Sequence, residues 1–259
     1  MTLYVGTSGW QYKDWRGVLY PAGVPVRRWL EEYAAHFPTV EINNAFYRLP
    51  TRENFEAWRD RLPADFVVAV KASRYLTHIK RLKDPEEPVE RLMSHAEGLG
   101  PRLGPVLLQL PPTLKADPAL LDVCLACFPR STRVAVEPRH ESWWTPEVRE
   151  VLETRHAALC WADARARPAT PLWRTTDWAY VRFHEGRAQP WPNYGRQSLK
   201  TWADRITRTW SADEDVYAYF NNDPNGAAVH NAPVFESLLR RNGAEPQRRI
   251  SAVPNPAQP

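Results

Sequence analysis

The chain has 259 residues, of which 43% are hydrophobic and 25% are charged, as is typical of a globular protein that buries a sizeable core. No apolar run approaches the roughly 20 residues of a membrane span, and the first residues lack a basic segment followed by an apolar one. We therefore expect a cytoplasmic protein with no membrane partner. The net charge of +4 is a mild basic excess carried mostly by arginine, whose planar group suits phosphate or carboxylate.

Strand-like apolar runs alternate with helical periodicity along the chain. The predicted strands span residues 3–8, 39–43, 66–71, 106–110, 133–137, 158–163, 179–184 and 216–221. The predicted helices span residues 26–36, 52–61, 85–98, 118–128, 146–156, 198–210 and 228–241. This alternation, without a break in composition, predicts one α/β domain over residues 1–243. Eight strands favour a TIM-type (β/α)8 parallel barrel over an open doubly wound sheet.

Two stretches depart from this alternation. Residues 164–177 contain two prolines and no apolar helical face, so we expect the sixth helix of the barrel to be degenerate. Residues 244–259 contain four prolines, and we expect them to form a disordered tail.

Every predicted strand carries a polar residue at or next to its C-terminal end. In a TIM barrel the C-terminal ends of the strands form the face that carries the active site. The fifth strand is the clearest case, because its apolar run passes directly into Glu137, Pro138, Arg139 and His140. The catalytic candidates at these strand ends are Glu41, Lys71, Glu137, Asp163, Arg182 and His184.

The charges of these candidates permit two interpretations. Glu41 and Glu137 are suited to work as a general acid and base, while Lys71 and Arg182 are suited to neutralise an anion or to shift the pKa of a carboxyl. The alternative is a buried ion-pair network with a structural role. The sequence leaves both interpretations open.

Aromatic and cationic residues alternate in the loops that follow the strands. Such a mixture favours a ligand with flat rings and phosphates. The segment 71–83 supports an anionic ligand, because it holds five Lys or Arg and no acid, and Arg165, Arg167 and Arg174 lie on a neighbouring link. The ligand-binding candidates are Trp10, Tyr12, Asn43, Tyr47, His78, Gln109, Arg139, Trp143, Tyr194, Asn221 and Asn222.

No cofactor and no metal site are predicted. Glu41, His78, Glu137, Asp163 and His184 have side chains that bind metals, but no H-x-x-x-H or D-x-D spacing joins them and the nearby cations would repel a metal ion. A divalent metal stays the less favoured alternative. Cys124 and Cys127 fall on one apolar helix face, and no glycine-rich phosphate loop is present.

The chain resembles the DUF72 family, also called YecE-like, from about residue 5 to residue 232. The segments that carry the resemblance are Gly6-Thr7-Ser8-Gly9-Trp10 with Tyr12, Trp15 and Gly17, Glu41-Ile42-Asn43-Asn44-Ala45-Phe46-Tyr47 with Pro50, Lys71 with Thr77-His78, Gln109-Leu110-Pro111-Pro112, Glu137-Pro138-Arg139-His140-Glu141-Ser142-Trp143, Arg182-Phe183-His184, Tyr219-Phe220-Asn221-Asn222-Asp223 and Asn231-Ala232. The resemblance implies a TIM-type barrel and a shared ligand site, but no established reaction. Ala45 departs from the family, which often has Thr before the Phe.

The leading hypothesis is an enzyme that acts on nucleic acid or nucleotides, such as a phosphodiester hydrolase that binds single-stranded nucleic acid. The first alternative is a carbohydrate-active enzyme with Glu41 and Glu137 as its carboxyl pair. The second is a binding protein without turnover. The sequence predicts no particular oligomeric state.

Overall fold

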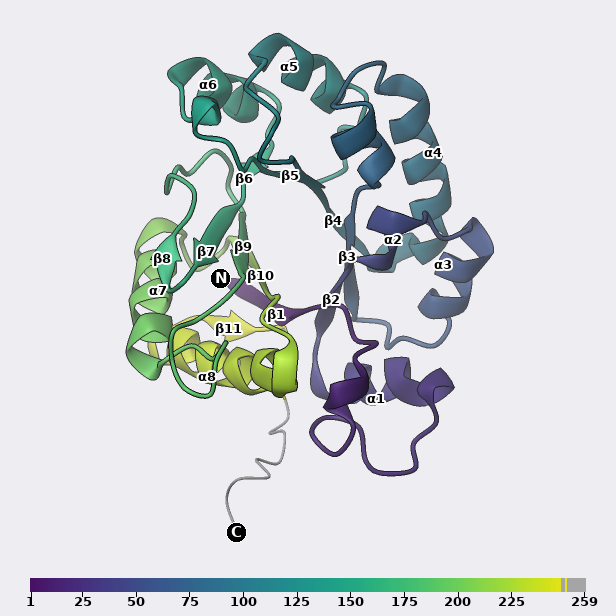
Figure 1. Cartoon of the computed structure of the whole chain (residues 1–259), viewed down its shortest axis with the longest axis vertical. Helices are drawn as coiled ribbons and strands as arrows, with labels where there is room; N and C mark the ends of the chain where they lie inside the picture. The colour runs from purple at the N-terminus through teal and green to yellow at the C-terminus, as the bar shows by residue number, and fades with distance from the viewer. Residues whose placement is uncertain (248–249, 251–259) are drawn as a thin grey trace.

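Eight parallel strands form a ring in the computed structural model, which describes residues 1–247 and residue 250 (Figure 1). Around the ring the strands are β1 (Thr2–Ser8), β2 (Thr39–Ile42), β3 (Val67–Lys71), β4 (Leu103–Gln109), β5 (Val134–Glu137), the interrupted strand β6 (Ala158–Leu159) and β7 (Trp161–Ala164), β9 (Ala179–Phe183) and β10 (Asp215–Phe220). Each pairs in parallel with its neighbours, and β10 pairs with β1. The predicted barrel and its eight strands are confirmed.

The ring closes through the strand that is interrupted at Cys160. β6 pairs with β5 on one side, and β7 pairs with β9 on the other. The backbone N–H of Cys160 donates to Val136 at 2.8 Å, so hydrogen bonding to β5 continues across the interruption. Thr170 and Thr175, from the following link, accept hydrogen bonds from the backbone N–H groups of Ala162 and Leu159. Their hydroxyls therefore satisfy backbone groups that lack a ladder partner.

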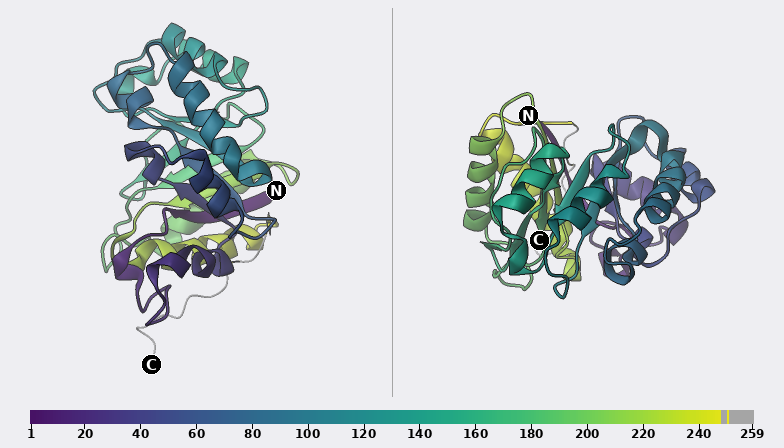
Figure 2. Two further views of the ribbon diagram at one scale, coloured as in Figure 1. Left: turned by 90° about the vertical axis from the view of Figure 1, so that its right-hand side faces the viewer. Right: turned by 90° about the horizontal axis from the view of Figure 1, so that it is seen from above.

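Helices cover the outside of the barrel, as Figures 1 and 2 show. They are α1 (Trp29–His36), α3 (Arg52–Arg59), α4 (Glu86–Ala96), α5 (Pro118–Ala126), α6 (Pro146–Thr154), α7 (Arg196–Thr209) and α8 (Ala227–Arg241). The side chains of Thr51, Asp117 and Thr145 accept N-terminal backbone N–H groups of α3, α5 and α6, which explains where these helices begin. All seven predicted helices are confirmed, and none in the described part of the chain is long and apolar enough to cross a membrane.

Short elements complete the connections. They are η1 (Lys13–Trp15), η2 (Val26–Arg28), α2 (Asn44–Tyr47), the π-helical η3 (Tyr75–Ile79), η4 (Glu97–Arg102), η5 (Glu141–Trp143), β8 (Arg167–Pro168) and η6 (Pro224–Gly226). Between β7 and β9, where all residues are described, β8 pairs antiparallel with β7 and no helix forms. The degenerate sixth helix is thereby confirmed.

The C-terminal segment differs from the predicted disordered tail. Glu245 and Pro246 form β11, which pairs in parallel with Thr2 and Leu3 of β1. The backbone N–H of Ile250 donates to Glu236 at 2.8 Å. The prediction is wrong for residues 244–247 and 250. Backbone groups at the N-terminal end of β1 are free to pair, and β11 pairs with them. The rest of the predicted tail lies outside the described residues.

The barrel interior is mostly apolar below the C-terminal ends of the strands. At those ends, which form the barrel mouth, it is polar. Ala69, Leu107, Ala135, Tyr180 and Tyr219 pack together inside the barrel. Side chains two residues apart in a strand share a face, so the residues that follow Ala69, Leu107, Ala135 and Tyr180 by two also point inward, at the C-terminal end of each strand. These following residues are Lys71, Gln109, Glu137 and Arg182.

Gly6 is a position where the barrel has no room for a side chain. A Cβ there would lie 2.2 Å from the carbonyl oxygen of Thr39 on the neighbouring strand. We predict that Gly6→Ala lowers the free energy of unfolding by about 1–3 kcal/mol, because the β1–β2 contact must open. Gly195→Ala is the control for the clash, since its nearest atom would be 3.9 Å away, and it should show only the smaller loss of replacing Gly by Ala at the N-cap of α7. Urea unfolding, followed by circular dichroism, measures both variants. A Gly6→Ala midpoint equal to that of the natural protein would refute the prediction.

Candidate functional site

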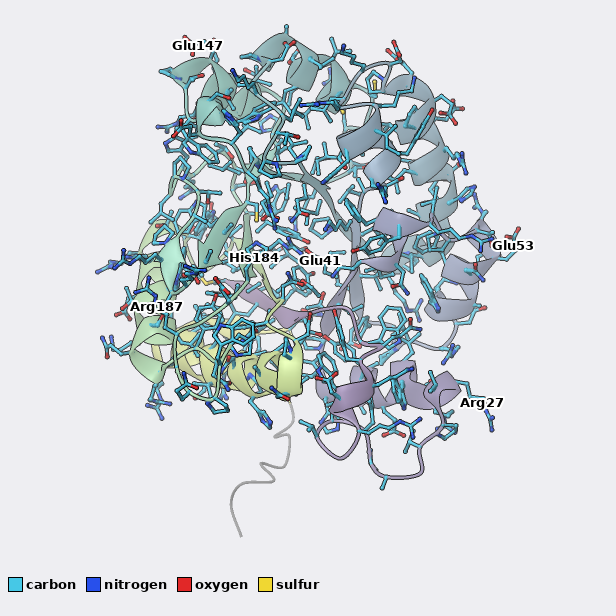
Figure 3. All side chains as sticks on the ribbon, viewed as in Figure 1. Arg27, Glu41, Glu53, Glu147, His184 and Arg187 are labelled. Carbon is cyan, nitrogen blue, oxygen red and sulfur yellow. The ribbon has the colours of Figure 1, made fainter. Side chains whose placement is uncertain are left out.

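Arg182 on β9 joins two carboxylates inside the barrel mouth. Its Nη1 donates to Glu137 Oε2 at 2.7 Å and its Nη2 donates to Glu41 Oε1 at 2.8 Å. All three side chains are no more than 1% exposed. Figure 3 places Glu41 near the barrel centre, whereas Glu53 and Glu147 lie at the periphery. We call Glu41, Arg182 and Glu137 the charge bridge; it links strands β2, β9 and β5.

Glu41 is held by two further donors. The Ser8 hydroxyl donates to Oε1 at 2.7 Å, and the Tyr180 hydroxyl donates to Oε2 at 2.6 Å. Burial raises the pKa of Tyr180 well above its usual range, so this phenol keeps its proton and remains a donor. Both oxygens of Glu41 therefore accept hydrogen bonds from within the barrel.

Glu137 is surrounded by donors as well. Gln109 Nε2 lies 2.9 Å from its Oε2, and Arg139 Nη2 lies 3.2 Å from its Oε1. Burial alone raises the pKa of Glu137, but the nearby positive charges, Arg182 first among them, outweigh it and hold this pKa well below the usual range. Glu137 is therefore ionised at neutral pH and is a weak base.

His184 connects Glu137 to the next strand end. Its Nε2 lies 2.8 Å from Glu137 Oε1, and its Nδ1 lies 3.2 Å from Asn221 Nδ2. Burial lowers the pKa of His184, so the ring is neutral at pH 7. A neutral ring fits these contacts if Nε2 carries the proton and Nδ1 accepts from the Asn221 amide. Figure 3 labels both His184 and Glu41 near the middle of the barrel.

Lys71 is a cation in the barrel mouth that forms no ion pair with Glu41 or Glu137. Its side chain ends β3 and is 9% exposed. Its Nζ lies 4.1 Å from the ring centre of Phe46, on α2. Among the described residues, Nζ makes no hydrogen bond or ion pair. Burial, followed by the charge of Arg182, lowers the pKa of Lys71 to about 8.

A cavity of about 460 Å³ opens above these groups. This volume lies in the range of small-molecule sites. No Asp or Glu lines it. The residues that line it are Gly9, Trp10, Gln11, Tyr12, Asn43, Asn44, Tyr47, Lys71, Gln109, Arg139, Arg182 and Asn221. A second hollow of about 420 Å³ shares Arg139 and Asn221 with it and reaches Glu137 and His184.

Comparison with known proteins identifies the family. A family model described as "Protein of unknown function DUF72" matches residues 4–258. The chain belongs to the DUF72 family. It is 27% identical over 274 residues to the UPF0759 protein YunF of Bacillus subtilis, covering 92% of this chain and 94% of that protein. It is 31% identical over 144 residues to YecE of Escherichia coli K12, covering 55% and 50%.

Solved structures agree with the fold. A DUF72 family protein from Thermotoga maritima superposes with a TM-score of 0.79 at 31% identity, covering 93% of this chain and all of the other. A second, from Enterococcus faecalis, has a TM-score of 0.76 at 20% identity, covering 92% and 96%. A fusion protein titled xylose isomerase-like TIM barrel/4-hydroxyphenylpyruvate dioxygenase has a TM-score of 0.52 at 15% identity, over 87% and 44%. The last two show the fold alone.

The DUF72 barrel brings most of the predicted site residues together, but not all. Asp163 lies elsewhere, because it accepts hydrogen bonds from Tyr194 Oη at 2.5 Å and from Trp202 Nε1 at 2.7 Å. Asp163 and Tyr194 thus hold a loop and α7 against the barrel. Burial raises the pKa of Asp163 to about 6. Neither residue lines the two hollows at the mouth.

Trp143, Asn222 and His78 also lie outside the two hollows. Trp143 Nε1 donates to the Leu114 carbonyl at 2.8 Å, and Asn222 Nδ2 donates to Asn231 Oδ1 at 2.8 Å. His78 packs edge-on against Phe46, and burial lowers its pKa. These contacts support local structure, and a ligand-binding role for the three residues stays a prediction.

The basic segment 71–83 contributes one side chain to the cavity, Lys71. Lys80 forms an ion pair with Asp84 at 3.1 Å, and Arg81 donates to the Thr113 carbonyl at 2.5 Å. Arg165 and Arg174, on the β7–β9 link, pair with Glu185 and Glu214. Four of these cations are thus held by the protein itself.

Several residues at the site were not among the candidates, including Ser8 and Tyr180, which donate to Glu41, and Gln11 and Asn44, which line the cavity. Phe46 provides the ring against which the Lys71 ammonium packs. Asp223 follows β10, its Oδ1 is buried without a hydrogen-bond partner among the described residues, and burial raises its pKa to about 7. The signal for Asp223 was its place at a polar strand end, immediately after Asn221 and Asn222. No group of three His, Cys, Asp or Glu in the described chain could hold a metal ion.

Arg182→Met tests the charge bridge. We predict a loss of about 3–5 kcal/mol in the free energy of unfolding at pH 7, because two buried carboxylates lose their shared cation. Without Arg182 the folded-state pKa of the buried Glu137 carboxyl rises above its unfolded value, so the folded variant gains a proton as pH falls. The deficit relative to the natural protein should therefore shrink between pH 7 and pH 5.

Urea titrations at pH 5, 6 and 7 measure this effect. Arg149→Met, which removes an exposed i,i+4 ion pair with Glu153, is the control and should change stability little at any of these pH values. A deficit for Arg182→Met that is below 1 kcal/mol, or that grows towards pH 5, would contradict a structural role for the bridge.

Proposed function

We propose that the mouth cavity binds a nucleotide, or the end of a single-stranded nucleic acid, through its phosphate and its base. The observation that carries the proposal is the lining of the cavity: Lys71, Arg139 and Arg182 are present without any Asp or Glu. Three cations against the two carboxylates of the charge bridge leave a net charge of +1 when Lys71 is protonated. An anion entering the cavity therefore meets an attractive field in a partly dehydrated space.

Arg139 and Lys71 are the groups best placed to contact a phosphate. The Arg139 side chain is 41% exposed, and its contacts to Glu137, at 3.2 and 3.4 Å, are longer than those that Arg182, His184 and Gln109 make to the same carboxylate. Lys71 has no acceptor among the described residues. Arg182, by contrast, already donates to both carboxylates and contributes mainly through its charge.

The aromatic rim supplies a place for a flat ring. Tyr47 lines the cavity with a side chain that is 75% exposed, and Trp10 and Tyr12 line the same cavity from the loop after β1. Stacking of a base on such a ring contributes roughly 1–3 kcal/mol. This combination of flat surfaces and phosphate-binding cations supports a nucleotide over inorganic phosphate.

The carbohydrate alternative is less well supported. A glycosidase needs one carboxyl that keeps a proton to donate, with its partner carboxylate across an open gap. Here Arg182 fills the space between Glu41 and Glu137, and the pKa of Glu137 is held well below its usual range. The same facts make Glu137 a poor base for phosphodiester hydrolysis. We therefore propose ligand binding, and hydrolysis of the ligand stays a prediction.

Titration of AMP by calorimetry tests the proposal. We expect Arg139→Ala to weaken binding at least tenfold, and Tyr47→Ala to weaken it roughly 5- to 150-fold, the equivalent of one stacked base. Arg149→Ala, on the outside of the barrel, should leave binding unchanged. Short single-stranded oligonucleotides should bind with an affinity that falls as salt rises, and neutral oligosaccharides should not compete.

The pH dependence gives a second test. Lys71 has a pKa of about 8 in the free protein and is neutral above it. Affinity for AMP should therefore fall several-fold from pH 7 to pH 9. Lys71→Arg, which keeps its charge, should show a clearly smaller fall, which is the part due to ionisation of Asp223 with its pKa of about 7. Binding that is independent of salt and pH, or that equals the binding of neutral sugars, would reject the proposal.

A further inference from the structure

The side chain of Lys71 has an unusual environment for a buried lysine. Buried ammonium groups are almost always paired with a carboxylate. Glu41 and Glu137 lie within range to influence the pKa of Lys71, yet both are engaged by Arg182, and the Lys71 Nζ faces the cavity and the Phe46 ring. The charge bridge thus takes up both carboxylates and leaves the amine available.

An available amine in a cavity is suited to nucleophilic attack when it is neutral. Burial and the neighbouring guanidinium of Arg182 lower the pKa of Lys71 to about 8. At pH 7 roughly a tenth of the molecules then carry the neutral amine, roughly 300 times more than for a lysine with an ordinary pKa. Desolvation beside another cation is an established way to activate a lysine.

We propose that Lys71 forms an imine with the carbonyl carbon of a phosphorylated aldehyde or ketone, such as an open-chain sugar phosphate. The phosphate would lie against Arg139, one of the two cations proposed above to contact a nucleotide phosphate, and away from Lys71, so this inference rests on the phosphate part of the proposed function. A sugar phosphate and a nucleotide share the same pairing of a phosphate with a pentose-sized body. The cavity of about 460 Å³ has space for either.

The reaction balances without any further reagent. The lone pair of neutral Nζ attacks the carbonyl carbon, and the C=O electron pair moves to oxygen, which takes up a proton. The resulting carbinolamine loses that oxygen as water while the C=N bond forms, and Nζ releases its second proton. One amine and one carbonyl thus give one imine and one water.

The protonated imine has partial compensation for its charge where it forms. It carries a positive charge at the Nζ position, where the fields of Glu41 and Glu137 offset part of the repulsion from Arg182. The face of Phe46, 4.1 Å from Nζ, adds a cation–π contact. Burial disfavours the ammonium because this ion loses its hydration. An iminium is less strongly hydrated, so burial disfavours it less.

Reductive trapping tests the inference. The protein is incubated with ribose 5-phosphate or dihydroxyacetone phosphate and reduced with borohydride, and the adduct is located by intact-mass and peptide mass spectrometry. We expect one adduct per chain, on Lys71, with a trapping rate that rises roughly 50-fold from pH 6 to pH 8, as the neutral fraction of an amine with a pKa of about 8 does. Ribose without phosphate should react at least tenfold more slowly.

Two variants serve as controls. Lys71→Arg keeps the positive charge but cannot form the imine, so it should lose the adduct. Lys80→Ala removes a lysine outside the cavity, whose ammonium pairs with Asp84, and should be trapped like the natural protein. Adducts spread over surface lysines, or an adduct on Lys71 that forms equally well with ribose, would overturn the inference.

The outcomes separate this inference from the proposed function. An adduct on Lys71 with ribose 5-phosphate, in a protein that does not bind AMP, supports the imine and rejects the nucleotide. Binding of AMP without any adduct on Lys71 supports the nucleotide and rejects the imine. Trapping of pyruvate in place of either sugar phosphate rejects a phosphorylated substrate.

Discussion

The interaction on which the barrel mouth depends is the double ion pair between Arg182 and the carboxylates of Glu41 and Glu137. Burying three charges costs several kcal/mol for each ion, and close geometry with additional hydrogen bonds is needed to offset that cost. The structure supplies both, because Ser8 and Tyr180 donate to Glu41 and because Gln109 donates to Glu137. One guanidinium thereby fixes strands β2, β5 and β9 relative to one another and orients the side chains around Glu137.

The lower barrel determines where this bridge lies. Small side chains on β3 and β5, Ala69 and Ala135, face large aromatic side chains on β9 and β10. The Tyr180 hydroxyl reaches Glu41 on β2, on another part of the ring, which shows how far the large side chains extend through the interior. Aromatic packing therefore closes the lumen below and supports the charged layer above it.

The sequence was sufficient for the barrel and for the convergence of Glu41, Lys71, Glu137 and Arg182, because strand periodicity and strand ends depend only on local residue order. The sequence did not show which side chains of an individual strand point into the barrel. Asp163 also lies near the end of a strand, but its neighbour Ala162 lines the second hollow, so Asp163 points outward towards Trp202. Long-range pairs, such as Trp143 with Leu114, and the pairing of Glu245 with β1 have no local signature. They follow from the assembled fold.

The charge balance of the mouth also restricts how a ligand can lie. A phosphate placed directly on Lys71 would raise the pKa of this amine and suppress its neutral form. Binding through phosphate and reaction at Lys71 are therefore compatible only if the two occupy different parts of the cavity. Arg139 provides that separation, because it borders both hollows and its side chain is 41% exposed, whereas Lys71 lies deeper, above Phe46. A ligand with its phosphate on Arg139 leaves the charge bridge intact and presents its carbon skeleton to the amine.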